Sequence, residues 1–245
     1  MQYFVFILLL ICSYLLGSIP TAYLLAKWAK GIDLRNYGSG NVGFTNLASS
    51  TSKWLAIPAF IFDVGKGALG IYVTRWLGLP LYMQGAVGIA AVIGHNWPVF
   101  LNFSAGRGVL TLVGAMLSLE PKLAVFLVLL SFLGIPFHVL ATTATLSIFL
   151  ATVMTWFSTT PVISWFFNAP LGDDKLTMTL IFFCLWLVIV IRRLTVPFSS
   201  FAREISRGEL MFNRFFLDRD IRNRELWLHR NSSSVMGKGE ERQSK

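Results

Sequence analysis

The chain has 245 residues, of which 55% are hydrophobic and only 13% are charged, and it carries a formal net charge of +9. Soluble domains have about 25% charged residues, so this composition excludes an ordinary water-soluble protein and predicts an integral membrane protein. The basic charge would also suit nucleic acid, but the sequence has no motif of a folded domain that reads bases, so we expect no nucleic-acid partner.

Seven long apolar blocks, nearly free of charge, follow one another along the chain. They cover residues 3–26, 54–77, 82–101, 109–119, 122–137, 141–167 and 176–191. A transmembrane helix needs about 20 apolar residues, so the fourth and fifth blocks are short. Broken at Leu119-Glu120-Pro121-Lys122, they predict either a hairpin of short or tilted helices or one re-entrant helix. We expect an all-α, polytopic membrane domain over residues 1–200, with seven spans.

The charges of the short loops predict how the spans are oriented. With the N-terminus outside, the inner side has seven basic residues: Lys27, Lys30, Arg35, Lys53, Arg107, Arg192 and Arg193. The outer side then has three: Arg75, Lys122 and Lys175. Cytoplasmic loops carry the excess of basic residues, so we expect the N-terminus outside and the C-terminus in the cytoplasm. The segments near Gly38–Asn46, Arg107 and His138 would then all face the cytoplasm.

The segment 201–245 differs in character from the rest of the chain, with ten Lys or Arg and seven Asp or Glu residues. Aromatic and apolar residues alternate with the arginines: Phe198, Phe201, Met211, Phe212, Phe215, Phe216 and Trp227. This pattern predicts an amphipathic segment on an anionic leaflet, followed by a disordered end. A solvated tail with ordinary charge next to the membrane explains the composition equally well.

Two polar, glycine-framed segments stand out between the apolar blocks. The first, Gly38-Ser-Gly-Asn-Val-Gly-Phe-Thr-Asn46, has the small side chains and the backbone N–H groups that can form an anion-binding nest. In the second, Ser104-Ala-Gly-Arg-Gly108, glycines flank an arginine whose planar guanidinium suits phosphate. Both predict phosphate ligands, although neither is a Walker loop, since no GxxxxGK[ST] pattern occurs.

Few other residues suggest chemistry. Asp63 and Lys66 lie three residues apart in the second block, which predicts either an ion pair that holds the helix in register or a wall of the ligand cavity. His95 lies where the third block should break, and His138 ends the fifth; each is a structural residue or a base near the phosphate site. No metal-ligand spacing and no GxSxG motif occurs, so we expect no metal, no cofactor and no serine nucleophile.

Six short motifs, in order over residues 1 to about 150, resemble one known family. They are Leu15-Leu-Gly-Ser-Ile-Pro20, Asp33-Leu-Arg35, the Gly38–Asn46 segment, Phe62-Asp-Val-Gly-Lys-Gly67, Gly94-His-Asn-Trp-Pro-Val-Phe100 and Gly106-Arg-Gly-Val109. The chain resembles the bacterial acyl-phosphate-dependent glycerol-3-phosphate acyltransferases, the PlsY-type family. The resemblance implies a seven-helix enzyme of the bacterial inner membrane, among membrane lipids, that moves an acyl group from acyl phosphate to the 1-hydroxyl of sn-glycerol 3-phosphate. Its product would be lysophosphatidic acid.

The resemblance also implies site residues. Arg107, where the family usually has lysine, and Ser39 would be catalytic. The substrate-binding set would be Gly38, Gly40, Asn41, Gly43, Thr45, Asn46, His95, Gly106 and Gly108. Phosphate is a good leaving group, so orientation of the hydroxyl and stabilisation of negative charge would suffice without a covalent enzyme intermediate.

Three segments depart from the family pattern. Ser49 replaces an arginine that usually follows the Thr-Asn pair, and Ile191-Arg-Arg-Leu-Thr-Val-Pro197 replaces a His-Arg-x-Asn motif. A serine-containing segment is also changed, to His138-Val-Leu-Ala-Thr-Thr143. We hypothesise that Arg192, Arg193 or His138 takes over the missing roles. Two other functions stay open: a non-catalytic relative that binds a phosphorylated lipid or headgroup, and a small-anion transporter.

Overall fold

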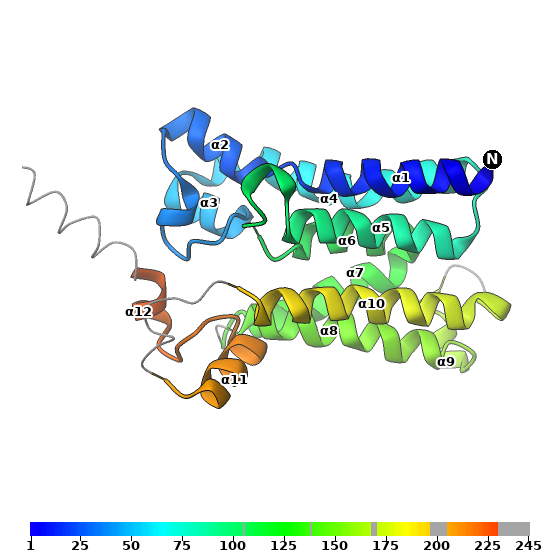
Figure 1. Ribbon diagram of the computed structural model, residues 1–245. Coiled ribbons are helices and arrows are strands. Elements are labelled where there is room, and N and C mark those ends of the chain that lie inside the picture. Colours follow the sequence, from blue (N-terminus) through cyan, green and yellow to red (C-terminus); the bar gives the residue numbers. More distant parts are fainter. Residues whose placement is uncertain (105, 138, 168–170, 197–204, 230–245) are drawn as a thin grey trace, which may run out of the picture.

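The computed structural model describes residues 1–104, 106–137, 139–167, 171–196 and 205–229, and these contain helices and no strands (Figure 1). In chain order the α-helices are α1 (Gln2–Gly17), α2 (Thr21–Lys30), α3 (Phe44–Ser50), α4 (Lys53–Trp76), α5 (Leu81–Asn96), α6 (Val109–Leu119), α7 (Pro121–Ser131), α8 (Leu140–Trp156), α9 (Pro161–Ser164), α10 (Lys175–Leu194), α11 (Arg207–Leu217) and α12 (Arg224–His229). Single 3₁₀ turns occur at Leu34–Asn36, Val99–Leu101, Phe132–Gly134 and Gly172–Asp174. The predicted all-α class is confirmed.

Three helical stretches are long and apolar enough to cross a membrane: Gln2–Lys30, Lys53–Trp76 and Gly172–Leu194. Shorter apolar helices cover Val109–Leu119, Pro121–Gly134 and Leu140–Trp156. The fourth predicted block coincides with α6, and the break predicted at Leu119-Glu120-Pro121-Lys122 separates α6 from α7. The number of crossings and their orientation remain predictions.

Two of the predicted blocks each contain two α-helices in the structure. The first, 3–26, breaks between Gly17 and Thr21, because Pro20 has no N–H to donate and takes φ −86° and ψ 72°. The sixth, 141–167, ends as α8 at Trp156, and Pro161 then begins the short α9. Uninterrupted helices at these two places were a wrong prediction, since average hydropathy does not register where a proline stops a hydrogen-bond ladder.

The helices form two packed groups (Figure 1). In the first group α4, α5 and α6 contact one another and α1 contacts α4 and α5; in the second, α8 packs on α7 and α10. The groups meet where α5 contacts α10 and α6 contacts α7. Glycines allow close crossings: a Cβ on Gly67 would lie 1.9 Å from the Thr111 carbonyl oxygen, and one on Gly114 would lie 2.0 Å from that of Val64. Small residues at helix crossings are typical of membrane bundles, where backbones approach closely.

The polar segments gather at the end of the bundle away from the N-terminus, at the left of Figure 1. Helices α2 and α3, the loop after α5, the C-terminal end of α10, and α11 all lie there. A small apolar core that includes Ala26, Leu34, Val42 and Leu47 holds the Gly38–Asn46 segment against this end. The predicted convergence of the polar segments at one end is therefore present in the fold.

Candidate active site

An ion pair fixes the chain just before the first glycine-rich segment. The Arg35 guanidinium donates to both Asp33 carboxylate oxygens, at 3.0 Å from Nε to Oδ1 and 2.6 Å from Nη2 to Oδ2. This hydrogen-bonded guanidinium lowers the pKa of the Asp33 carboxyl below its usual value. Leu34, between the two, is fully buried. The Asp33-Leu-Arg35 motif thus fixes the backbone just before the Gly38–Asn46 loop.

Asn46 organises the Gly38–Asn46 loop from inside. Its side chain is only 3% exposed. The amide nitrogen donates to the carbonyls of Leu34 (3.2 Å) and Tyr37 (2.9 Å), and Oδ1 accepts from the Ser39 N–H at 3.1 Å. Gly38 takes φ +52°, and a Cβ there would lie 2.4 Å from Asn46 Oδ1. The carboxamide is therefore committed to shaping the loop.

Several loop N–H groups are already bonded to neighbouring residues. The Ser39 N–H reaches Asn46, that of Gly40 donates to the Tyr37 carbonyl, and that of Asn41 donates to the Ser39 hydroxyl at 3.4 Å. These three N–H groups are therefore not free to bind an anion in this conformation, and the anion-binding nest stays a prediction. Thr45 is exposed, at the first turn of α3.

The second glycine-framed segment passes close to the first. A Cβ on Gly106 would lie 2.3 Å from His95 Nε2 and 2.7 Å from the Val42 carbonyl oxygen. Gly108 caps the N-terminal end of α6 with φ +69°, a conformation that favours glycine. Only glycines fit on either side of Arg107, so these close approaches determine where the arginine backbone lies.

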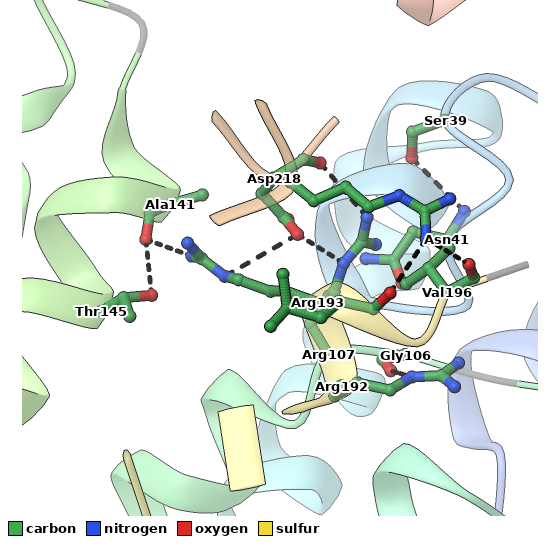
Figure 2. A network of polar contacts seen from close by, with 12 residues as sticks. Ser39, Asn41, Gly106, Arg107, Ala141, Thr145, Arg192, Arg193, Val196 and Asp218 are labelled. Atoms are coloured by element: carbon green, nitrogen blue, oxygen red, sulfur yellow. Dashed lines mark hydrogen bonds and ion pairs between the residues drawn. The ribbon is translucent and has the colours of Figure 1, made fainter. Parts of the chain in front are cut away.

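Three arginines meet around this segment (Figure 2). Arg107 Nε lies 2.6 Å from Asp218 Oδ1, and Arg193 Nε lies 3.8 Å from the same oxygen. Arg192 Nε donates to the Gly106 carbonyl at 3.0 Å, and its guanidinium lies 5.7 Å from the centre of the Trp97 ring. The side chain of Arg193 is 1% exposed and that of Arg107 13%. The end of α10 and the Arg107 loop thus form one cationic cluster.

The predicted pairing of Asp63 with Lys66 is confirmed. Lys66 Nζ lies 2.8 Å from Asp63 Oδ1, with side chains 1% and 2% exposed, and also donates to the Ile19 carbonyl at 3.3 Å, where α1 breaks. His95 Nδ1 lies 3.7 Å from the same carboxylate oxygen. A small pocket borders these groups; Ser18, Thr21, Val42, Asp63 and His95 are among the residues that line it.

The structure therefore brings together His95, Val42 and Gly106, and joins Arg107 to Arg192 and Arg193 through Gly106 and Asp218. His138 lies outside the described residues, as do Phe198 and Phe201. Among the residues that are described, no three His, Cys, Asp or Glu side chains gather into a metal site.

Two residues escaped the sequence analysis. Asp218 belongs to no motif, and its contacts with Arg107 and Arg193 reveal it. The side chain of Asn96 is fully buried, and neither its oxygen nor its nitrogen has a hydrogen-bond partner among the described residues. In the sequence, its position next to His95 in Gly94-His-Asn-Trp-Pro-Val-Phe100 could have indicated a role near the site. This buried amide lies next to the Arg107 loop and can still donate and accept hydrogen bonds.

The glycerol-3-phosphate acyltransferase family model matches residues 7–199. The chain belongs to this family. Glycerol-3-phosphate acyltransferase 4 of Dehalococcoides mccartyi (strain CBDB1) is 41% identical over 234 residues, covering 94% of this chain and 96% of that one. The enzyme of Pseudomonas paraeruginosa is 50% identical over 114 residues, covering 46% of this chain and 60% of its own.

A solved structure resembles the fold as well. The crystal structure of PlsY (YgiH), an integral membrane glycerol 3-phosphate acyltransferase in its glycerol 3-phosphate form, matches with a TM-score of 0.64 and 29% identity, covering 77% of this chain and 88% of that chain. The lysophosphatidic acid form matches with a TM-score of 0.62 and 28% identity. The resemblance carried by the six motifs is thus confirmed, and the chain is a membrane acyltransferase.

Proposed function

We propose that this protein transfers an acyl group from acyl phosphate to the 1-hydroxyl of sn-glycerol 3-phosphate, giving lysophosphatidic acid and phosphate in phospholipid synthesis. Family membership supports the acyl transfer to glycerol 3-phosphate. The observation that carries the site is the cluster of Arg107, Arg192 and Arg193 at the polar end of an apolar bundle. Guanidinium groups in such a partly buried place bind phosphate oxygens strongly.

The reaction needs few protein groups. The 1-hydroxyl oxygen attacks the acyl carbon, the bond from that carbon to the phosphate oxygen breaks, and the departing phosphate accepts the hydroxyl proton. Arg107 would stabilise the negative charge that develops on the reacting oxygens, and Ser39 would help to orient the hydroxyl. Gly38, Gly40, Asn41, Gly43, Thr45 and Asn46, with His95, Gly106 and Gly108, would form the walls of the substrate site.

The placement in the membrane is part of the proposal. We infer seven spans in the bacterial inner membrane, with the N-terminus outside and the polar end in the cytoplasm, where glycerol 3-phosphate is available. Residues 1–200 would form the membrane domain. The segment after residue 200 would lie on the anionic leaflet, and the exposed Met211, Phe212 and Phe216 on α11 support this.

The experiment uses purified protein with radiolabelled glycerol 3-phosphate and either acyl phosphate or acyl-CoA. We expect labelled lysophosphatidic acid from acyl phosphate alone, and a loss of about a hundredfold or more in Arg107→Ala. Arg222→Ala is the matched control, because the Arg222 side chain is 71% exposed and contacts Glu209 and the Phe212 ring, away from the arginine cluster. Product from acyl-CoA would contradict the proposal that acyl phosphate is the acyl donor. No product from either donor, with folded protein, would favour a binding relative without catalysis.

A further inference from the structure

Asp218, whose carboxylate contacts Arg107 and Arg193, lies in a segment that follows the residues matched by the family model. That match ends at residue 199, whereas Asp218 directly follows α11. The alignment with the Dehalococcoides mccartyi relative covers 94% of the chain, which leaves about 15 residues unmatched, fewer than the 46 that follow residue 199. The α11 segment therefore lies outside the family match. The relative nevertheless matches at least part of the chain that follows residue 199.

Arg107 depends on Asp218 for its orientation. Its Nε donates to Asp218 Oδ1 at 2.6 Å and its Nη2 to the Asp218 carbonyl at 3.2 Å. Within the described part of the chain, no other residue accepts a hydrogen bond from this guanidinium. The flanking glycines have no side chains to support it. A long side chain with several free torsions needs such a partner to keep one geometry.

Asp218 is itself held firmly. Arg214 Nη1 donates to the Leu194 and Val196 carbonyls at 3.0 and 2.8 Å, which ties α11 to the end of α10. Arg193 Nη1 donates to the Phe215 carbonyl at 2.9 Å. Leu210, Asn213 and Arg214 are at most 3% exposed. A segment anchored this way is part of the site architecture, because lifting it would leave several buried polar groups without partners.

The charges of the cluster favour the binding of one more anion. Arg107, Arg192 and Arg193 carry three positive charges against the single carboxylate of Asp218, so the cluster keeps an excess that suits a phosphate dianion. Arg193 Nε is buried, lies 3.8 Å from Asp218 Oδ1 and has no hydrogen-bond partner among the described residues. A buried unpaired donor beside a cationic cluster favours an acceptor oxygen in its reach.

We propose that Asp218 is a positioning residue: it fixes the Arg107 guanidinium, and Arg193 Nε is left to donate to an oxygen of the substrate phosphate. The inference rests on the proposed function, in which a phosphate monoester or an acyl phosphate enters this cluster. These share the phosphate group, so the KM values for glycerol 3-phosphate and for acyl phosphate, measured separately, distinguish which substrate the pair holds.

The test compares Asp218→Ala, Asp218→Asn and Asp218→Glu, with Glu209→Ala as the matched acidic control on α11. We measure kcat and both KM values, and the Kd of inorganic phosphate for each protein. Asp218→Ala and Asp218→Asn should lose about tenfold to a hundredfold in kcat/KM and in phosphate affinity, the range of one charged hydrogen bond. Asp218→Glu should recover part of the loss, and Glu209→Ala should match the wild type.

A double-variant cycle separates positioning from a general loss of stability. In an Arg107→Ala background, Asp218→Ala should lower neither kcat/KM nor phosphate affinity any further. Additive losses would overturn the proposal, since Asp218 would then act through the fold. Tighter phosphate binding or a lower KM in Asp218→Asn would overturn it too, because the carboxylate would be a competitor of the substrate. If the wild type makes no product but phosphate binding shows the expected pattern, the proposed function fails and the positioning role stands.

Discussion

At the scale of single residues, Asn46 has the largest expected effect in the glycine-rich loop. Its buried carboxamide bonds to Leu34, Tyr37 and Ser39 at once. Asn46→Ala would leave two carbonyls and one N–H without partners, at a cost of about 1–3 kcal/mol for such a group. We expect a lower thermal unfolding midpoint in detergent and a fall in acyl transfer of about tenfold or more.

Asn36→Ala is the matched control for this change. Asn36 lies in the same region, is exposed, and makes no side-chain hydrogen bond among the described residues. It should keep the wild-type midpoint and rate. Equal behaviour of the two variants would mean that the loop keeps its shape without the Asn46 carboxamide.

Residue patterns predicted some of the site and could not predict the rest. Arg107 could be singled out because glycines on both sides mark a backbone that passes close to something, and Gly106 does press on His95. Asp218 could not, because it lies 111 residues from Arg107 and no local spacing reports such a contact. The anion-binding nest stays a prediction, because glycine content does not tell whether Asn46 or a ligand accepts the hydrogen bonds of the loop N–H groups.

At the scale of helices, the crossing of α4 and α6 depends on two glycines. Gly67→Ala would place a Cβ 1.9 Å from the Thr111 carbonyl oxygen, so the helices must separate. Overpacking of this kind costs about 1–3 kcal/mol. Heating in detergent should therefore show an unfolding midpoint lower by roughly 2–4 °C for each kcal/mol.

Gly65 provides the comparison within the same helix. It is exposed, and a Cβ there would meet no atom within 4 Å. Gly65→Ala should leave the midpoint unchanged or raise it, since alanine favours helix more than glycine does. A drop in Gly65→Ala as large as that in Gly67→Ala would show that the close crossing is not what matters.

Hydropathy predicts the positions of some helices closely, but it does not show where prolines separate one helix from the next. Charge-free blocks bounded by polar residues gave α4 and α6 almost to the residue, because each block there is one unbroken helix. The blocks that contain Pro20 and Pro161 predict one helix each, whereas the structure has two helices in each block. The first pair, Gln2–Lys30, is still one candidate span. Helix α11 was expected only as an amphipathic segment, since its burial against α10 comes from contacts of Arg193 and Arg214 that no periodicity shows.

At the scale of the whole molecule, the two ends of the bundle differ in charge. The end that holds Lys27, Lys30, Arg35 and Arg107 is the basic one, and Arg75, Lys122 and Lys175 belong to the other. Three arginines of the basic end lie within the site cluster. If that end also faces the cytoplasm, one set of charges both orients the protein in the membrane and binds a cytoplasmic anion.

Cysteine labelling from each side of the membrane tests this orientation. With Cys12 and Cys184 replaced by alanine, Asn36→Cys marks the basic end and Asp173→Cys the end near the N-terminus; both positions are exposed. A maleimide that cannot cross membranes should label Asp173→Cys on intact bacterial cells, and Asn36→Cys only after permeabilisation. The reverse pattern would place the arginine cluster outside, where a cytoplasmic glycerol 3-phosphate pool could not supply it, so it would contradict the orientation and the proposed entry of substrate together.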